Sequence, residues 1–203
     1  MTGRRRTLYM TVVIIGLMLV ALAGCGKGGN TFQLSRLGFS MKLPPGWQQG
    51  EPGIMGGFKP RAGGEFFFAD PELDDPHGNV MDFPLMEGES LAEYVDNLIS
   101  ETEKMEQMQA GLLRVLGEVA GVEQSEEIKE AEKQLQTKVL SKTPRTISKH
   151  EAIEVLTEAP FTLLTVYILK GDTVIWVTFR APKEEFPQYE QLFRDAIETI
   201  KIR

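Results

Sequence analysis

The feature that most restricts the fold is a pair of apolar segments near the C-terminus, residues 161–170 and 173–180, separated by Gly171 and Asp172. Their β-branched and aromatic content predicts two strands, and the Gly-Asp pair predicts a tight turn between them. In the second strand, alternate residues form one face from Val174, Trp176 and Thr178 and the other from Ile175, Val177 and Phe179. Because both faces are largely apolar, we expect this strand in the centre of a sheet that is covered on both sides.

Two helices are predicted to provide that cover. The first begins at Ser90, where Ser90 and Glu93 have the spacing of a capping box. Its apolar face is formed by Leu91, Val95, Leu98, Thr102, Met105 and Leu112. We expect this helix to end near Gly111 or Gly117. The second helix carries an apolar stripe at helical spacing, formed by Phe186, Tyr189, Phe193, Ala196, Ile197 and Ile200.

Further strands are predicted from short alternating segments at 31–35, 38–43, 54–58, 65–69, 79–86 and 152–157. The acidic segment 121–133 is compatible with a helix and with a mobile loop. The order of these elements predicts an α+β domain with a mostly antiparallel sheet flanked by helices on both faces. Methionines, among them Met105 on the apolar face of the first helix, are expected to fill the core, as are Trp47 and Trp176.

One segment carries a family resemblance. Gly38-Phe39-Ser40-Met41-Lys42-Leu43-Pro44-Pro45-Gly46-Trp47 is similar to the opening strand of the PsbP-like family and its P-x-G-W end. The predicted helix at Ser90, the late hairpin and the aromatic C-terminal helix have the same order in that family, which includes bacterial lipoproteins of the DcrB type. The resemblance implies one α/β/α sandwich over residues 31–203 that works by contacting other proteins. It implies no shared active site, so no functional residue is transferred.

The N-terminus resembles a bacterial lipoprotein signal. Arg4, Arg5 and Arg6 precede an uncharged, mostly apolar segment at 10–23, which is short for a membrane-spanning helix. It ends in Leu22-Ala23-Gly24-Cys25, which resembles a lipobox. The resemblance implies a signal peptide at 1–24, removed by cleavage, and a diacylglycerol with fatty acids such as palmitate attached to Cys25. Residues 25–30 would be a lipidated flexible spacer. The alternative is an uncleaved anchor helix.

Charge and composition exclude several classes of function. The formal charge of −7 becomes −10 once the three N-terminal arginines are removed. An acidic surface argues against nucleic acid as a partner and against electrostatic docking on anionic lipid. Cys25 is the only cysteine. If it is acylated, disulfides, a cysteine nucleophile and thiolate metal sites are all excluded.

Catalytic motifs are not found. The segment His150-Glu151-Ala152-Ile153-Glu154 lacks the second histidine of a zinc protease. His77 is the only other histidine, and no Gly-x-Ser-x-Gly nucleophile elbow is present. The glycines at 24–29 follow no predicted strand and do not form a phosphate loop. We therefore expect neither enzymatic activity nor a cofactor.

An acidic segment at 70–82 is the candidate ligand site. Its possible ligands are Asp70, Glu72, Asp74, Asp75, His77 and Asp82. Oxygen ligands at alternate positions are typical of calcium loops, but the sixth position is Asp75 instead of glycine and the twelfth is Met81 instead of glutamate. The prediction is a solvated acidic loop, with a divalent-metal site or a protein contact as alternatives.

The sequence thus predicts a non-enzymatic lipoprotein of the cell envelope, anchored to a membrane through Cys25 and acting as an interaction or support module for another envelope protein. The alternative is a lipoprotein that binds a divalent metal or another small ligand through residues 70–82. In a Gram-negative cell the expected location is the periplasmic face of the outer membrane, and otherwise the outer face of the plasma membrane.

Overall fold

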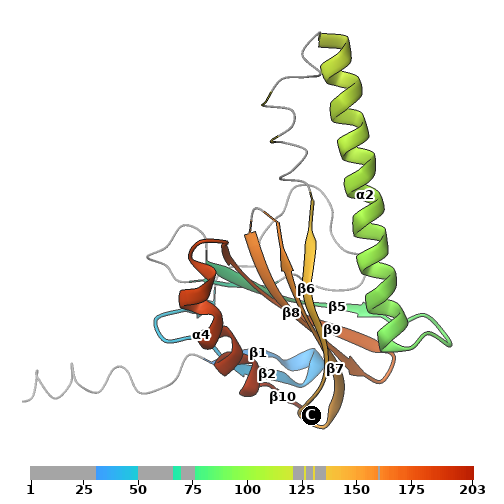
Figure 1. Cartoon of the computed structure of the whole chain (residues 1–203). Helices are drawn as coiled ribbons and strands as arrows, with labels where there is room; N and C mark the ends of the chain where they lie inside the picture. Colours follow the sequence, from blue (N-terminus) through green and yellow to red (C-terminus); the bar gives the residue numbers. More distant parts are fainter. Residues whose placement is uncertain are drawn as a thin grey trace, which may run out of the picture.

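The computed structural model describes residues 31–49, 66–69, 76–120, 126, 130, 136–159 and 161–203. The predicted signal peptide, Cys25 and the spacer lie outside these residues, as do the predicted strand at 54–58 and most of 121–133. The described part contains a large sheet, a small sheet and two helices (Figure 1). None of its helices combines the length and the hydropathy of a membrane span.

The large sheet has seven strands in the order β3-β4-β5-β9-β8-β7-β6, and all neighbours are antiparallel. The strands are β3 (Gln48–Gln49), β4 (Phe66–Ala69), β5 (His77–Pro84), β6 (Lys138–Ile147), β7 (His150–Glu158), β8 (Phe161–Lys170) and β9 (Thr173–Pro182). The strand with two apolar faces, β9, occupies the middle position, as predicted. The turn at Gly171 and Asp172 joins β8 to β9, and Gly171 has the positive φ of 58° that favours glycine.

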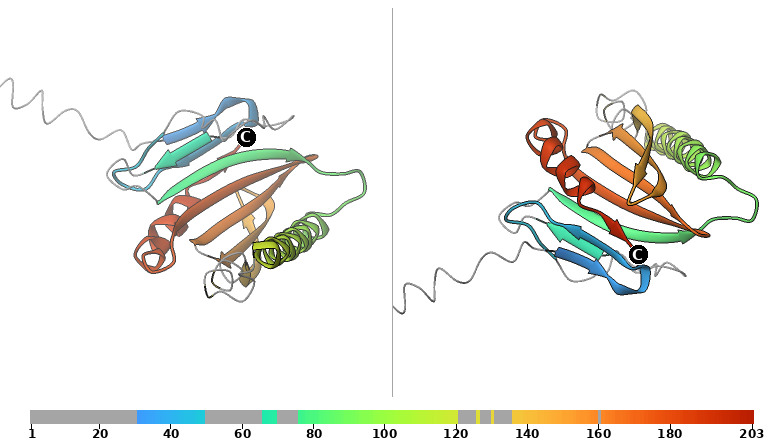
Figure 2. Two further views of the ribbon diagram at one scale, coloured as in Figure 1. Left: turned by 90° about the horizontal axis from the view of Figure 1, so that it is seen from above. Right: turned by 90° about the horizontal axis from the view of Figure 1, so that it is seen from below.

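The small sheet packs over one face of the large one together with α4 (Phe186–Glu198). Its strands are β1 (Thr31–Leu34), β2 (Phe39–Lys42) and β10 (Lys201–Ile202), in the order β1-β2-β10, and η1 (Ser35–Leu37) links the first two. Figure 2 shows the small sheet and α4 on the side of the large sheet that faces away from α2. Gly38 permits the close approach of the C-terminal residue, because a Cβ there would lie 2.7 Å from the carbonyl oxygen of Arg203.

The main core lies between these layers. Its largest side chains have less than 2% of their surface exposed and include Trp47, Phe32, Phe39, Phe179, Phe193 and Met41. The predicted stripe on the C-terminal helix is buried here, since Phe186, Phe193, Ala196, Ile197 and Ile200 all belong to this cluster. The predicted packing roles of Trp47 and of the C-terminal helix are therefore confirmed.

A second, smaller core lies on the opposite face, under α2 (Leu91–Ala120). Leu91 and Val95 pack there against Ile153 and Val155 of β7 and Val174 of β9. The predicted capping box is present: the Ser90 amide donates to Glu93 Oε2 at 2.9 Å, and the Glu93 amide donates to Ser90 Oγ at 3.2 Å. The Ser90 hydroxyl also donates to Glu93 Oε2, at 2.7 Å. The bonds that this carboxylate accepts from the Ser90 amide and hydroxyl lower the pKa of Glu93, because they stabilise its ionised form.

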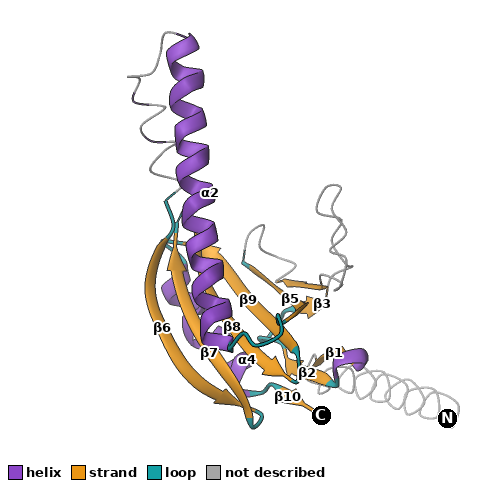
Figure 3. Cartoon of the chain, turned by 90° about the vertical axis from the view of Figure 1, so that its right-hand side faces the viewer, coloured by secondary structure: helices purple, strands orange, loops and turns teal. Residues whose placement is uncertain are grey.

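The course of α2 differs from the prediction. It continues through Gly111 and Gly117 to Ala120, and its C-terminal half extends past the ends of the strands (Figures 1 and 3). Met105 and Leu112 were expected in the core but are more than half exposed, as are Met86 and Met108. Core filling is thus wrong for these residues and correct for Met41. Met55 lies outside the described residues.

The strand β6 was not predicted, because its sequence contains Pro144 and mostly polar residues. Such a composition suits an edge strand, where one row of backbone groups faces solvent. The α+β class and the antiparallel sheet are confirmed. The structure differs from the predicted α/β/α sandwich in two ways. The helix α2 covers only part of one face of the large sheet, and a second sheet covers the other face together with α4.

Candidate functional site

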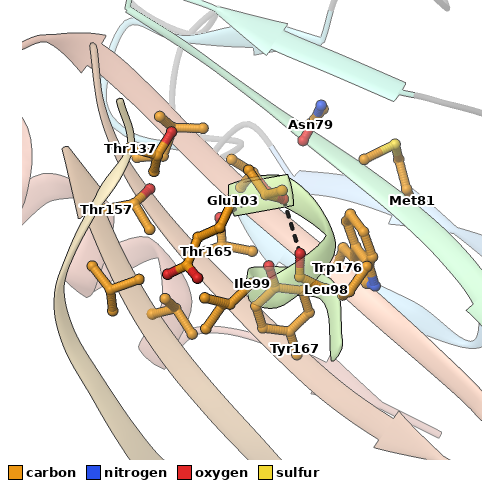
Figure 4. A pocket seen from close by; sticks show the side chains of 15 residues that line it. Asn79, Met81, Leu98, Ile99, Glu103, Thr137, Thr157, Thr165, Tyr167 and Trp176 are labelled. Carbon is orange, nitrogen blue, oxygen red and sulfur yellow. Dashed lines mark hydrogen bonds between the residues drawn. The ribbon is translucent and has the colours of Figure 1, made fainter. Parts of the chain in front are cut away.

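A cavity of about 330 Å³ lies between α2 and the large sheet, where the helix begins to leave the strands (Figure 4). Leu98, Ile99, Thr102 and Glu103 form its helical side. Its sheet side consists of Asn79, Met81, Thr137, Val139, Val155, Thr157, Leu163, Thr165, Tyr167, Trp176 and Thr178. Residues from six elements and the segment before β6 therefore meet around one space.

The inner end of the cavity is an aromatic cluster around Trp176. The ring of Trp176 lies 4.6 Å from that of Phe83, 5.2 Å from Tyr167 and 6.3 Å from Tyr94, measured between centroids. Burial raises the pKa of Tyr167 to about 12, and the nearby Tyr94 adds to the shift. Trp176 Nε1 is buried without a hydrogen-bond acceptor among the described residues. This end of the cavity is therefore apolar and closely packed.

The outer end of the cavity is polar. On this face of the sheet, one row of cross-strand neighbours is apolar and aromatic, and the next row along the strands is polar. In one row Met81, Trp176 and Tyr167 are register partners across β5, β9 and β8. In the next row Asn79 pairs with Thr178 and Thr178 with Thr165, whose hydroxyl oxygen lies 3.2 Å from that of Thr178.

An apolar helix face gains little from covering threonine and asparagine, which accounts for the departure of α2 from the sheet at this row. The resulting cavity combines an apolar wall with several hydroxyl groups, a lining suited to binding.

A second surface feature lies on the free half of α2. The large side chains Met105, Met108, Leu112, Val115, Leu116 and Val119 are 54–83% exposed. We call these six residues the α2 seam. At 100° per residue they lie within about 100° of arc on the helix, so they form one continuous apolar stripe. The neighbouring Glu106 is oriented toward the protein, where its Oε2 accepts the Thr137 amide at 3.0 Å.

A charged cluster lies on the opposite face of the sheet. Glu154 is 5% exposed and accepts one bond of 2.5 Å from Arg145 Nη1 and another of 2.5 Å from Arg194 Nη1. Arg194 also binds Glu190 and Arg145 binds Glu198, so α4 is joined to β6 and β7. Because each oxygen of the buried carboxylate accepts a bond from an arginine, the cluster holds α4 against β6 and β7.

The candidate ligands in 70–82 do not converge in the part of the chain that is described. Asp70, Glu72, Asp74 and Asp75 lie outside it. His77 and Asp82 belong to strand β5 instead of a loop, and their side chains point to opposite faces of the sheet. Asp82 is 7% exposed and binds Arg36 through both oxygens, one at 2.6 Å. The two residues therefore cannot bind the same ion.

Other potential ligands are also separated. His150 Nδ1 lies 3.0 Å from the carbonyl oxygen of Leu169 and helps hold β7 to β8. Within the described ranges, no three His, Cys, Asp or Glu side chains are close enough together to hold a metal ion.

Solved structures with a similar fold include cyanobacterial PsbP (CyanoP) from Synechocystis sp. PCC 6803. The TM-score is 0.55 at 11% sequence identity, and the match covers 89% of this chain and 98% of that one. A protein of unknown function from Pseudomonas aeruginosa gives a TM-score of 0.47 at 15% identity, covering 86% of this chain and 96% of that one. No family model and no curated protein matches the chain. At such identities the likeness shows the fold alone. The chain has a PsbP-like fold.

Sequence reasoning missed both the cavity and the α2 seam. The cavity is formed by single residues from many elements, so no local pattern indicates it. The seam did have a signal: Leu91, Leu98, Met105, Leu112 and Val119 repeat at intervals of seven. Such a repeat is typical of helices that pack on another helix, although its first member, Leu91, packs on the sheet in this chain.

Proposed function

We propose that the protein is a non-enzymatic lipoprotein of the cell envelope, a PsbP-like α/β/α module that works by binding another protein through the α2 seam. In this proposal residues 1–24 are a signal peptide, Cys25 carries the lipid, and residues 25–30 connect the lipid to the domain at 31–203. The location is the periplasmic face of the outer membrane in a Gram-negative cell, or else the outer face of the plasma membrane.

The observation that carries the proposal is the exposure of the α2 seam. Six large apolar side chains in one stripe on a helix that extends from the body of the protein are the usual mark of an interaction site. The PsbP-like fold is compatible with such a role but does not by itself assign one. The acidic composition supports attachment through lipid, since an anionic membrane would repel the domain.

The anchor is tested by Cys25→Ala in the producing cell. We expect the wild-type chain to incorporate an alkyne-labelled palmitate and to fractionate with membranes. The Cys25→Ala chain should remain unlabelled and accumulate as precursor or as soluble protein. Normal maturation and labelling of Cys25→Ala would refute lipid attachment at this residue.

The interaction surface is tested by Leu112→Asp in the full chain. After chemical crosslinking of intact envelopes, the wild-type chain should give a discrete adduct that Leu112→Asp loses. Gln107→Asp is the matched control, because residue 107 lies about 140° around the helix from residue 112 at 100° per residue. Equal adducts from all three chains would show that the α2 seam is not the binding surface.

The cavity favours a second candidate function, binding of a small ligand with an apolar body and a polar group. The sequence suggested a small-ligand-binding lipoprotein as the alternative, with the site in the acidic segment 70–82. The cavity offers a different site for the same kind of function. The fluorescence of N-phenyl-1-naphthylamine should increase on saturable binding to the wild-type chain, and Thr178→Phe should abolish the increase by filling the cavity. Thr146→Phe, at an exposed residue near the other end of β6, is the control. An unchanged response in Thr178→Phe would exclude the cavity as the site.

A further inference from the structure

The free half of α2 is covered on one side only, where Gly117 is buried and Ala110 and Leu113 are half-buried. An isolated helix shorter than about 12–15 residues is marginal even for favourable sequences. The segment 105–120 is little longer and contains Gly111 and Gly117, which are poorer helix formers than alanine. It also exposes the six apolar side chains of the α2 seam. Packing against another helix would supply the stabilisation that this segment lacks.

The spacing within the α2 seam fits a second helix as the partner. Met105, Met108, Leu112, Val115 and Val119 are separated by steps of three, four, three and four residues. These steps correspond to alternating a and d positions of a heptad, whose side chains insert between those of a second helix in a coiled coil. The same spacing in the first half of α2 packs Leu91 and Val95 on the sheet, so the spacing allows a second helix and the charges beside the α2 seam decide between occupants.

From this spacing and from the charges beside the α2 seam we infer that the occupant is a second copy of this chain, whose α2 packs antiparallel to the first around a two-fold axis near Gly111. The inference deepens the proposed function, on which it rests for the role of the α2 seam. In an antiparallel coiled coil an a position faces a d position of the other helix. Met105 then faces Val115 of the partner subunit, and Met108 faces Leu112 of the partner subunit.

The charges beside the α2 seam select this orientation. Lys104 and Glu118 occupy g positions at the two ends of the same flank, and neither has an ion-pair partner among the described residues. In the antiparallel register Lys104 of each subunit lies beside Glu118 of the partner subunit, so the two-fold axis forms this pair twice. In a parallel pair Lys104 would face Gln109 of the partner subunit, and neither charge would meet an opposite one.

The centre of the interface also fits. Gly111, the middle g position, would lie beside Gly111 of the partner subunit, and a Cβ at this residue meets no atom of the described residues within 4 Å. The space beside it is therefore open to another helix. Lipid attachment would confine both copies to one surface and raise their effective concentration, which favours a contact of modest size.

The register is tested by charge exchange in the full chain, purified in detergent and measured by sedimentation equilibrium at matched buoyant density. The wild-type chain should form a monomer–dimer equilibrium. Lys104→Glu and Glu118→Lys should each weaken it about tenfold, because each variant replaces two attractive pairs by two repulsive ones. The double variant Lys104→Glu/Glu118→Lys restores opposite charges and should return the dissociation constant to within about twofold of the wild type.

A crosslinking experiment tests the same register independently. Gly111→Cys treated with a short bismaleimide should give a covalent dimer, whereas Gln107→Cys and the wild-type chain should not. The Gly111→Cys change is compatible with the helix, since the site is open and glycine is the poorer helix former.

A chain that stays monomeric at all concentrations, or a double variant that is weaker than both single variants, would overturn the inference. The chain would stay monomeric if the α2 seam were covered by another segment of the same chain or by a different protein. Loss of the envelope adduct in Leu112→Asp alongside a monomeric wild type would leave the proposed function standing. A dimer formed by a chain that shows no lipid labelling would support the inference and refute the lipid anchor.

Discussion

Replacement of Phe193 by alanine tests whether the C-terminal helix holds the main core together. Phe193 is fully buried, and its ring lies 4.7 Å from Phe179, 5.5 Å from Trp47 and 5.9 Å from Phe186, measured between centroids. Truncation of a buried phenylalanine typically costs about 3–5 kcal/mol, and we take the middle of that range for this residue. We therefore expect a loss of about 4 kcal/mol in the free energy of unfolding.

Urea unfolding followed by tryptophan fluorescence measures this loss, because Trp47 contacts the mutated site. With a slope of about 2 kcal/mol per M for a domain of this size, the midpoint should fall by about 2 M. Leu140→Ala on β6 is the control, since this side chain is 41% exposed and should change stability by less than about 0.5 kcal/mol. A midpoint for Phe193→Ala equal to that of the control would show that α4 does not contribute to the core as described.

Three further predictions concern the helix cap, the aromatic cluster and the acidic segment. Ser90→Ala should destabilise the fold by about 1 kcal/mol at neutral pH. Because the pKa of Glu93 is lowered in the fold, the contribution of the capping box is present above the ordinary glutamate pKa of 4.5 and is lost as pH falls, so the difference in urea midpoint should shrink in acid. The raised pKa of Tyr167 affects stability at alkaline pH. The free energy of unfolding should be unchanged below pH 10 and should fall by up to about 2.7 kcal/mol as pH rises toward 12. In urea titrations, Tyr167→Phe should lack this part of the alkaline loss. Calcium, magnesium or zinc should leave the thermal midpoint unchanged, and a saturable increase abolished by Asp74→Asn would instead support a metal site in 70–82.

The elements that the sequence predicted well are those whose burial is encoded locally. In β9 both faces are apolar, and the strand lies at the centre of the sheet. On α4 the spacing of Phe186, Phe193 and Ile197 matches a buried stripe, and at Ser90 the capping box marks the start of α2. Each of these signals arises within about a dozen residues, so no knowledge of the rest of the chain is needed to recognise it.

The features that were missed depend on how far one element extends over another. The apolar face of α2 continues past the end of the sheet, so the same spacing that buries Leu91 and Val95 leaves Met105 and Leu112 exposed. Asp82 looked like a member of an acidic loop, yet it is buried in β5 and paired with Arg36, forty-six residues earlier. Only the tertiary structure brings those two residues together, and only it creates the cavity beneath α2.

Photo-crosslinking from the α2 seam in living cells tests the central claim most directly. The full chain would carry p-benzoylphenylalanine in place of Met108, which is 68% exposed, or in place of Gln107 as a control on another side of the helix. If the protein works through the α2 seam, irradiation should give one discrete adduct from position 108 and none from position 107. An adduct of twice the mass of the chain would identify the second copy, and a larger or smaller adduct would identify a different protein. The absence of any adduct from position 108, or equal adducts from both positions, would contradict the account.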